Sequence, residues 1–333
     1  MPQHEGPDTR DEEMSEATSR LMAAGTLLAN GESLRGLAGG SRQRSVAVDT
    51  TPPEEVDIAI ITVLPEEFAA VRQRLENPQL AAGLAERPNS YAWETATLPG
   101  RSGDYRVVLA MAGRPGNISG ALVTVDTVER WHPRYVIMVG IAGGLAPGIA
   151  LGDVVVSTTI YGYEYGKLLA DKFQPRTAFV YATDGALVSS SKRMAVIGDG
   201  WRSSLSPHPE PFAPKVFHGE VASGEKVVDS RNASLFREIL QVWPNLSAVE
   251  MEGAGAAGAI EALRSRQTIG FAMVRGISDI PPGTSVSGQP ADAGVVQSRQ
   301  RDKSKVIASD TAAAFVIHWI TQGWPVLPKV RKE

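Results

Sequence analysis

The sequence predicts an α/β domain in which short apolar strands alternate with amphipathic helices from residue 56 onward. The chain has 333 residues, 43% of them apolar and 33 of them glycine, which is enough to bury one large core. Two segments, 248–255 (AVEMEGAG) and 274–279 (VRGISD), change abruptly from apolar to charged residues. Strand ends of this kind carry the chemistry of many α/β enzymes, so both segments point to an active site.

The individual elements follow from hydrophobic periodicity. Apolar runs of strand length predict strands at 56–63, 105–111, 135–139, 153–160, 219–222, 247–251 and 270–275. Apolar residues at helical spacing predict helices at 66–75, 118–131, 231–242, 253–264 and 307–321. These elements form one catalytic domain over residues 54–328.

Three segments depart from this alternation. Residues 1–53 are rich in Glu, Arg, Ser and Gly with few large apolar side chains, and are expected to form a disordered leader. Residues 172–214 and 281–302, rich in Pro or in Pro, Gly and Ser, are expected to be irregular lids or partner-binding loops.

Composition excludes several classes of protein. The absence of cysteine rules out a disulfide framework and cysteine-ligated zinc, and favours a cytoplasmic protein. The net charge of −4 gives no electrostatic case for binding a nucleic acid polymer, and no apolar run predicts a membrane span. The five histidines are scattered without ligand spacing, so no metal site is expected.

Residues 140–145 (GIAGGL) lie between a strand and a turn, where glycines permit a ligand to approach the backbone closely. Alone, this loop is as compatible with a structural turn as with a ligand site. It matches neither the P-loop nor the full dinucleotide fingerprint.

Taken together, five segments occur in the order typical of one family: 62–67 (TVLPEE), 139–144 (VGIAGG), 151–156 (LGDVVV), 249–252 (VEME) and 275–279 (RGISD). The chain resembles the purine nucleoside phosphorylase and uridine phosphorylase superfamily, and most closely its methylthioadenosine/S-adenosylhomocysteine nucleosidases. The resemblance implies a three-layer phosphorylase/hydrolase-like fold with a mixed, partly barrel-like central sheet flanked by helices. It also implies cleavage of an N-glycosidic bond without metal or organic cofactor, and a homodimer.

The resemblance also implies roles for individual residues. Asp279 would act as general acid at N7 of the purine, Glu67 would activate the attacking water, and Arg275 would position that water. Glu252 would hold the ribose hydroxyls while Met251 packs against the sugar. The remaining substrate-binding residues would be Ile141, Gly143, Val227 and Ser278, with Val227 in place of the aromatic residue that stacks on the purine in the family.

Each assignment has a structural alternative. Glu67 could be a first-turn helix glutamate that the helix dipole favours, and Asp279 could be a turn residue before Pro281. Arg275 could be a buried partner of Glu250 or Glu252. Glu250 is expected to be structural, because adjacent strand residues point to opposite faces. Only one of Glu250 and Glu252 is expected to hold the ligand.

Hydrolysis is favoured over phosphorolysis. Phosphorylases of the hexameric class carry an arginine ahead of the Gly-rich loop and a serine within it, whereas this chain has Met138 and Ile141. Neither side chain can bind phosphate, and Glu67 would repel it. A phosphorolytic enzyme remains the less favoured alternative.

The 5′ substituent of the substrate is left open. Lys226 and Arg114 are two cations that could contact a 5′-phosphate, in which case the substrate would be AMP or ATP and the protein a defence or signalling effector. A non-catalytic nucleoside-binding module is the weakest alternative, because Glu67, Glu252 and Asp279 are all present.

Overall fold

The computed structural model describes residues 55–81, 91–197, 200–208, 212–228, 230–281 and 294–329, with the backbone alone at 234 and 294–303. The predicted leader, residues 1–53, lies outside the described residues, as do parts of the segment 281–302. In the described part of the chain, no helix combines the length and the apolar character that a membrane span requires.

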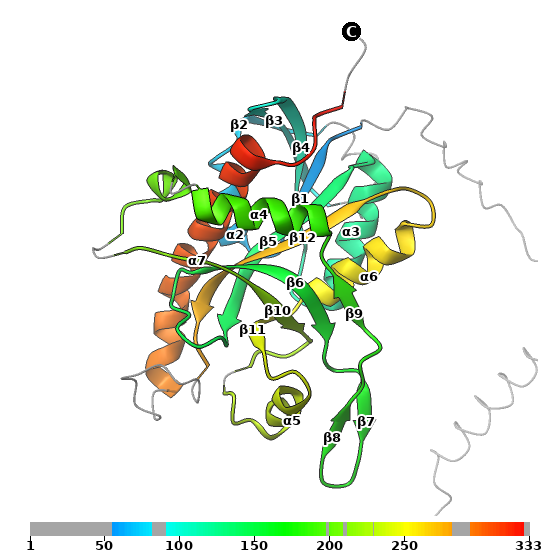
Figure 1. The fold of residues 1–333 in the computed structure, drawn as a ribbon, viewed down its shortest axis with the longest axis vertical. Helices are drawn as coiled ribbons and strands as arrows, with labels where there is room; N and C mark the ends of the chain where they lie inside the picture. The colour runs from blue at the N-terminus through cyan, green and yellow to red at the C-terminus, as the bar shows by residue number, and fades with distance from the viewer. Residues whose placement is uncertain are drawn as a thin grey trace, which may run out of the picture. The chain divides into compact units, whose positions relative to one another are not determined.

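A ten-stranded mixed sheet forms the centre of the domain (Figure 1). In spatial order its main path contains β11 (Leu246–Glu250), β10 (Val216–Ser223), β6 (Val154–Gly162), β12 (Gly270–Asp279), β5 (Tyr135–Gly144), β1 (Ile58–Thr62), β4 (Gly103–Met111), β3 (Trp93–Gly100) and β2 (Glu76–Leu80), while β9 (Val180–Ala182) pairs with β6. Strand β12 is parallel to β5 and antiparallel to β6. The predicted mixed sheet is therefore confirmed.

Part of the sheet closes on itself. Strand β11, at one end of the path, also pairs antiparallel with β5, through Ala248 opposite Gly144 and Val249 opposite Gly143. Strands β5, β12, β6, β10 and β11 thus form a closed ring, the partly barrel-like arrangement that the resemblance implied. The closure brings the ends of β5, β11 and β12 together.

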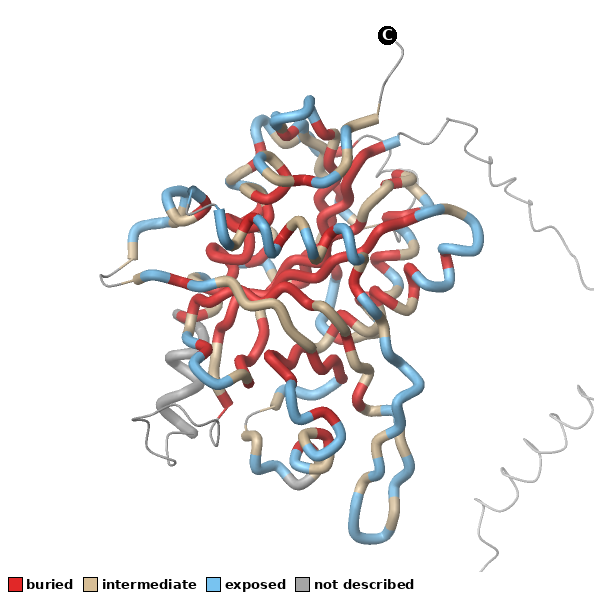
Figure 2. The backbone as a smooth tube through the Cα atoms, viewed as in Figure 1, coloured by how far each residue is buried: buried red, intermediate tan, exposed pale blue. Residues whose placement is uncertain are grey.

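Helices cover both faces of the sheet. Alternation along β5 sends Val136 and Met138 into a core shared with α3 (Asn117–Trp131) and α6 (Gly253–Leu263). Ile137 and Val139 enter a second core with α2 (Pro65–Arg72), α4 (Gly185–Ile197) and α7 (Gly294–Gly323). Figure 2 shows these strands buried between the layers. The predicted three-layer architecture is confirmed.

The smaller elements lie around this frame. Helix α5 (Ser234–Val242) packs against β11 in a third apolar cluster that includes Phe236, Ile239 and Trp243. Strands β7 (Gly166–Leu168) and β8 (Phe173–Pro175) form a separate hairpin, largely exposed in Figure 2.

Three sequence predictions were wrong. Residues 172–214 are not simply irregular, because they contain β8, β9, α4 and a 3₁₀ helix (Gly200–Ser204). Helix α7 begins at Gly294, inside the segment expected to be a loop. Residues 140–144 are not a loop but the end of β5, because they pair with β12 on one side and β11 on the other.

Candidate active site

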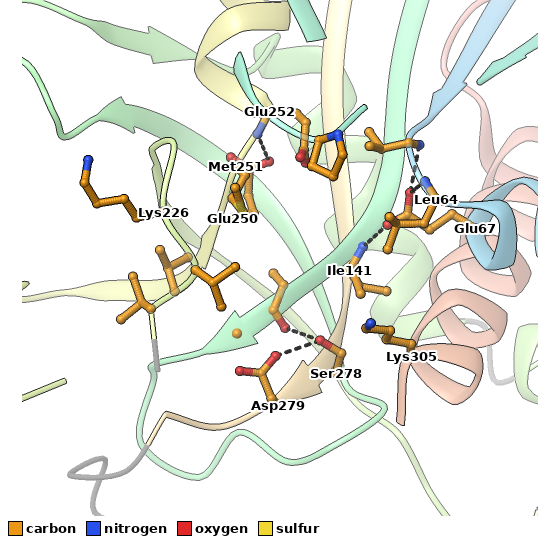
Figure 3. Close-up of a pocket in the computed structure, with 17 residues that line it drawn as sticks. Leu64, Glu67, Ile141, Lys226, Glu250, Met251, Glu252, Ser278, Asp279 and Lys305 are labelled. Carbon is orange, nitrogen blue, oxygen red and sulfur yellow. Dashed lines mark hydrogen bonds between the residues drawn. The ribbon is translucent and has the colours of Figure 1, made fainter. Parts of the chain in front are cut away.

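A cavity of about 240 Å³ opens where β5, β11 and β12 end (Figure 3). Nine residues that the sequence analysis proposed line it: Glu67, Ile141, Gly143, Lys226, Val227, Met251, Glu252, Ser278 and Asp279. Two others, Arg275 and Arg114, are not among the lining residues. Residues far apart in the sequence therefore converge on one small pocket.

Glu67 lies on the first turn of α2 with its carboxylate turned back toward β1 and β5. Its Oε2 accepts hydrogen bonds from the backbone N–H of Val63 (2.8 Å) and Leu64 (2.9 Å), and its Oε1 accepts one from Ile141 (2.9 Å). Burial raises the pKa of Glu67, while Arg275 and the three N–H groups oppose that shift. Glu67 is thus more than a helix-dipole glutamate, because it joins α2 to β5 at the cavity wall.

Glu252 lies at the N-cap position of α6 and is 6% exposed. Its Oε1 accepts a hydrogen bond from the backbone N–H of Gly116 (3.1 Å), and its Oε2 lies 3.3 Å from Nη2 of Arg275. Burial raises the pKa of Glu252 to about 7, with Arg275 lowering it and Glu250 raising it further. Met251 lines the cavity immediately before it.

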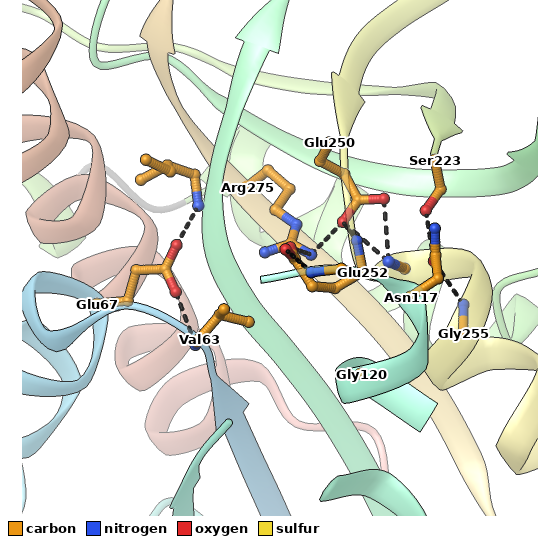
Figure 4. A network of polar contacts seen from close by, with 12 residues as sticks. Val63, Glu67, Asn117, Gly120, Ser223, Glu250, Glu252, Gly255 and Arg275 are labelled. Atoms are coloured by element: carbon orange, nitrogen blue, oxygen red, sulfur yellow. Dashed lines mark hydrogen bonds and ion pairs between the residues drawn. The ribbon is translucent and has the colours of Figure 1, made fainter. Parts of the chain in front are cut away.

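The N-terminus of α6 is held by side chains that fix Glu252 in place (Figure 4). The N–H of Gly253 donates to Glu250, that of Ala254 to Ser223 Oγ (2.9 Å) and that of Gly255 to Asn117 Oδ1 (2.7 Å). The first orphan donors of the helix are therefore satisfied by protein groups. The sequence analysis missed this role of Glu250, which also lines the cavity.

Arg275 lies within β12 and is fully buried. Its Nη2 donates a hydrogen bond to Glu250 and lies near Glu252, so the structural alternative of a buried ion-pair partner is realised. Its Nη1 and Nε find no hydrogen-bond acceptor among the described residues. Because Arg275 does not line the cavity, it is placed to act through the carboxylates.

The packing around Gly140 shows why glycine is required at this position of β5. A Cβ atom at Gly140 would overlap Nη1 of Arg275 and come within 2.7 Å of Oε1 of Glu67. The missing side chain lets the guanidinium and the carboxylate approach the same point of the strand from neighbouring elements. The motif is thus a packing requirement of the charged network.

Asp279 closes the opposite side of the cavity at the end of β12. Its Oδ1 lies 2.8 Å from the hydroxyl of Ser278, which is also 3.4 Å from the carbonyl oxygen of Ala142. A Cβ at Gly143 would lie 3.4 Å from Oδ2 of Asp279, so glycine leaves this carboxylate open to the cavity. Figure 3 shows Asp279 and Ser278 on the wall facing Met251 and Glu252.

The two predicted 5′-phosphate contacts are weakly placed. Lys226 lines the cavity, but its side chain is 59% exposed and pairs with Glu164 at 2.7 Å. Arg114 is exposed and outside the lining. Val227, at the position of the family's stacking residue, is an exposed rim residue.

A different lysine, Lys305 of α7, does line the cavity and was not predicted. The sequence analysis ended the expected loop at residue 302 and began the helix at 307, so Lys305 fell between the two. In the described residues no group of three His, Asp or Glu side chains is arranged to hold a metal ion.

Comparison with known proteins gives three kinds of match. A family model described as the phosphorylase superfamily matches residues 57–317. The 5′-methylthioadenosine/S-adenosylhomocysteine nucleosidase of Bacillus pumilus (strain SAFR-032) is 29% identical over 232 residues, which cover 67% of this chain and 85% of that protein. The ATP nucleosidase Cap17 of Escherichia coli (strain KTE188) is 24% identical over 286 residues, covering 80% of this chain and 51% of that protein.

The fold is also matched by a solved structure. The 5′-methylthioadenosine/S-adenosylhomocysteine nucleosidase from Neisseria meningitidis, in complex with methylthio-immucillin-A, superposes with a TM-score of 0.59 at 24% identity. The match covers 80% of this chain and 98% of that chain. At this identity the likeness establishes the architecture.

Proposed function

This chain belongs to the phosphorylase superfamily, and from that premise we propose that it is a nucleosidase. It would hydrolyse the N-glycosidic bond of an adenine nucleoside, or of a 5′-substituted one, and release free base and a ribose moiety. The observation that carries the proposal is the convergence of Glu67, Glu252 and Asp279 on one cavity. The nucleosidase names of the relatives support hydrolysis.

The reaction forms a C1′–O bond from water and breaks the C1′–N9 bond, whose electron pair leaves with the purine. Glu67 removes a proton from the water, and burial, which raises the pKa of its carboxyl, favours that step. Arg275 acts as a positioning residue, because it holds Glu250 and Glu252 from behind the cavity wall. Its charge also offsets the buried carboxylates around it.

The other two carboxylates act on the two halves of the substrate. Asp279 supplies the proton that neutralises the departing purine at N7. Glu252 accepts hydrogen bonds from the ribose hydroxyls and favours the positive charge that develops on the sugar. Fixing Glu252 through α6 and Gly116 makes this stabilisation pre-organised.

The cavity wall argues against inorganic phosphate as nucleophile. Ile141 presents an apolar side chain beside Glu67, and Met138 is fully buried in the core, so neither offers phosphate a donor. A buried carboxylate at the attacking position repels an anion, whereas it accepts a proton from water.

A second candidate substrate class is a 5′-phosphorylated nucleoside. The similarity to the ATP nucleosidase Cap17 extends over 80% of this chain, which favours nucleotides as an alternative to thio-nucleosides.

The proposal also covers the oligomeric state of the protein and its location in the cell. The chain would act as a homodimer in the cytoplasm. Ile118 and Leu122, four residues apart on α3, are 74% and 55% exposed and form an apolar strip suited to a second copy. Size-exclusion chromatography with light scattering would report a monomer if the proposed assembly is wrong.

The test is chromatographic detection of free adenine after incubation with adenosine, methylthioadenosine, S-adenosylhomocysteine, AMP and ATP, each with and without phosphate. We expect phosphate-independent release that falls by about 10²–10⁴-fold in Asp279→Asn. Release that requires phosphate would identify a phosphorylase. No release from any substrate would contradict the nucleosidase and favour a binding module.

A further inference from the structure

Helix α7 packs directly over β12 and contributes Lys305 to the lining of the cavity. A Cβ at Gly276 would overlap the carbonyl oxygen of Ala308, so the helix backbone lies against the strand. Gly276 in turn pairs with Ile141 of β5. This close contact fixes the preceding turn of α7, which carries Lys305, beside the cavity.

Lys305 is half-buried and lines the cavity. In Figure 3 it lies next to Ile141 and Ser278, on the side opposite Lys226. Its ammonium group therefore comes from a helix that is packed in the core, whereas Lys226 lies in an exposed turn.

The orientation of a substrate follows from the proposed roles. With the purine at Asp279 and the ribose hydroxyls at Glu252, the 5′ position falls to the rest of the lining, which includes Leu64, Ile141 and Lys305. An apolar 5′-thioalkyl group has no use for an ammonium group there, whereas a phosphoryl group pairs with it through charge-assisted hydrogen bonds.

We propose that Lys305 is a specificity-determining residue that binds an anionic 5′-phosphoryl group, so that the substrates are 5′-phosphorylated adenine nucleosides. The inference rests on the proposed nucleosidase function for the orientation of the substrate. It replaces Arg114 and Lys226 as the phosphate contacts.

Free phosphate has the same chemistry as a 5′-phosphoryl group, and the cavity favours the latter. A free phosphate ion acting as nucleophile would have to approach the ribose beside the buried carboxylate of Glu67. A 5′-phosphoryl group is part of the substrate, so it can contact Lys305 while water occupies the position beside Glu67.

The experiment measures kcat/KM for AMP, ATP and adenosine in the wild-type protein, Lys305→Met and Lys226→Met, with the exposed Lys192→Met on α4 as matched control. We expect the wild type to prefer AMP or ATP over adenosine. The ratio of kcat/KM for AMP to that for adenosine should fall roughly 10- to 100-fold in Lys305→Met, the usual effect of losing one hydrogen bond to a charged group. It should fall less in Lys226→Met and stay constant in Lys192→Met.

A second readout does not depend on turnover. The affinities of AMP and adenosine for Asp279→Asn, with and without Lys305→Met, can be measured by calorimetry. Adding Lys305→Met should weaken the binding of AMP relative to adenosine by the same factor as it lowers the kcat/KM ratio. An unchanged ratio and unchanged AMP binding would overturn the inference, as would a larger effect of Lys226→Met. Phosphate-stimulated cleavage of adenosine with formation of ribose 1-phosphate, lost in Lys305→Met, would assign Lys305 to free phosphate. If no substrate is cleaved, the proposed function fails, while the AMP binding data still decide the role of Lys305.

Discussion

Replacing Glu252 with glutamine tests whether this buried carboxyl controls the pH response of the protein. Glu252 is 6% exposed, and burial raises its pKa from 4.5 to about 7 in the folded protein. The folded state then binds a proton more tightly than the unfolded state. Its contribution to stability is complete below about pH 4.5 and is lost as the pH rises toward about 7.

The magnitude follows from the shift. One pKa unit corresponds to about 1.4 kcal/mol, and integration from about pH 5 to about pH 8 gives a loss of roughly 2–3 kcal/mol from this group. The wild type should therefore lose roughly 2–3 kcal/mol more of its unfolding free energy over this interval than Glu252→Gln does. After burial, the negative charges of Glu250 and Glu67 raise the pKa of Glu252 further, while Arg275 lowers it, and the variant removes the Glu252 carboxyl from this group.

Urea unfolding, followed by tryptophan fluorescence at several pH values, measures this difference. Glu261→Gln, on the exposed face of α6, is the matched control and should follow the wild type. The kcat/KM of the wild type should rise with pH toward about 7 as Glu252 ionises, and this rise should be missing from Glu252→Gln. A constant difference in unfolding free energy between wild type and Glu252→Gln would refute the assigned pKa shift.

Three further substitutions examine the same network. Glu67→Gln should reduce adenine release by about 10²–10⁴-fold, because an amide cannot take the proton of water. Substitution of the exposed neighbour, Glu66→Gln, is the control, and an equal loss of activity in both variants would contradict the role of Glu67. Arg275→Met should lower the unfolding free energy by about 3–5 kcal/mol because it strands buried carboxylates, and a loss below about 1 kcal/mol in urea unfolding would show that the ion pairs are not structural. Gly140→Ala should destabilise the protein by about 1–3 kcal/mol and lower kcat, because its Cβ would displace Arg275 or Glu67. A melting temperature equal to that of the wild type would argue against the close packing.

The sequence was most informative where local pattern and tertiary environment agree. Strand β1 is an almost continuous apolar run because both of its faces are covered by helices, so its position was predicted correctly. Helix α4 was missed because three serines in succession lower its helix propensity, although Leu187, Ser191 and Met194 are buried at helical spacing. The prolines of residues 172–214 made this segment look like one long loop.

The misses at the candidate site have a common physical cause, which is pairing between segments far apart in the chain. Glycines at 140–144 predict a turn locally, but β12 and β11 bind both edges of this segment and hold it as a strand. Glu250 looked structural by strand alternation, and it does hold Arg275 and α6, yet it also borders the cavity because β11 ends there. Lys305 was not predicted because its position beside the cavity depends on the contact between Gly276 and Ala308, which local sequence does not indicate.

The network around Arg275 connects these observations to function. Three carboxylates, Glu67, Glu250 and Glu252, act electrostatically on one guanidinium, so the cluster carries more negative than positive charge when all are ionised. Burial raises the pKa of Glu67 and of Glu252, and the charges of Glu250 and Glu67 raise that of Glu252 further. The same negative charge favours a cationic ribose in the transition state. Burying Glu252 near neutral pH therefore costs stability, and it places a negative charge beside the sugar on which the proposed reaction develops positive charge. Substitutions that relieve the excess charge should therefore both stabilise the fold at about pH 8 and slow catalysis. For Glu252→Gln, the change in the pH dependence of the unfolding free energy should accompany a loss of activity.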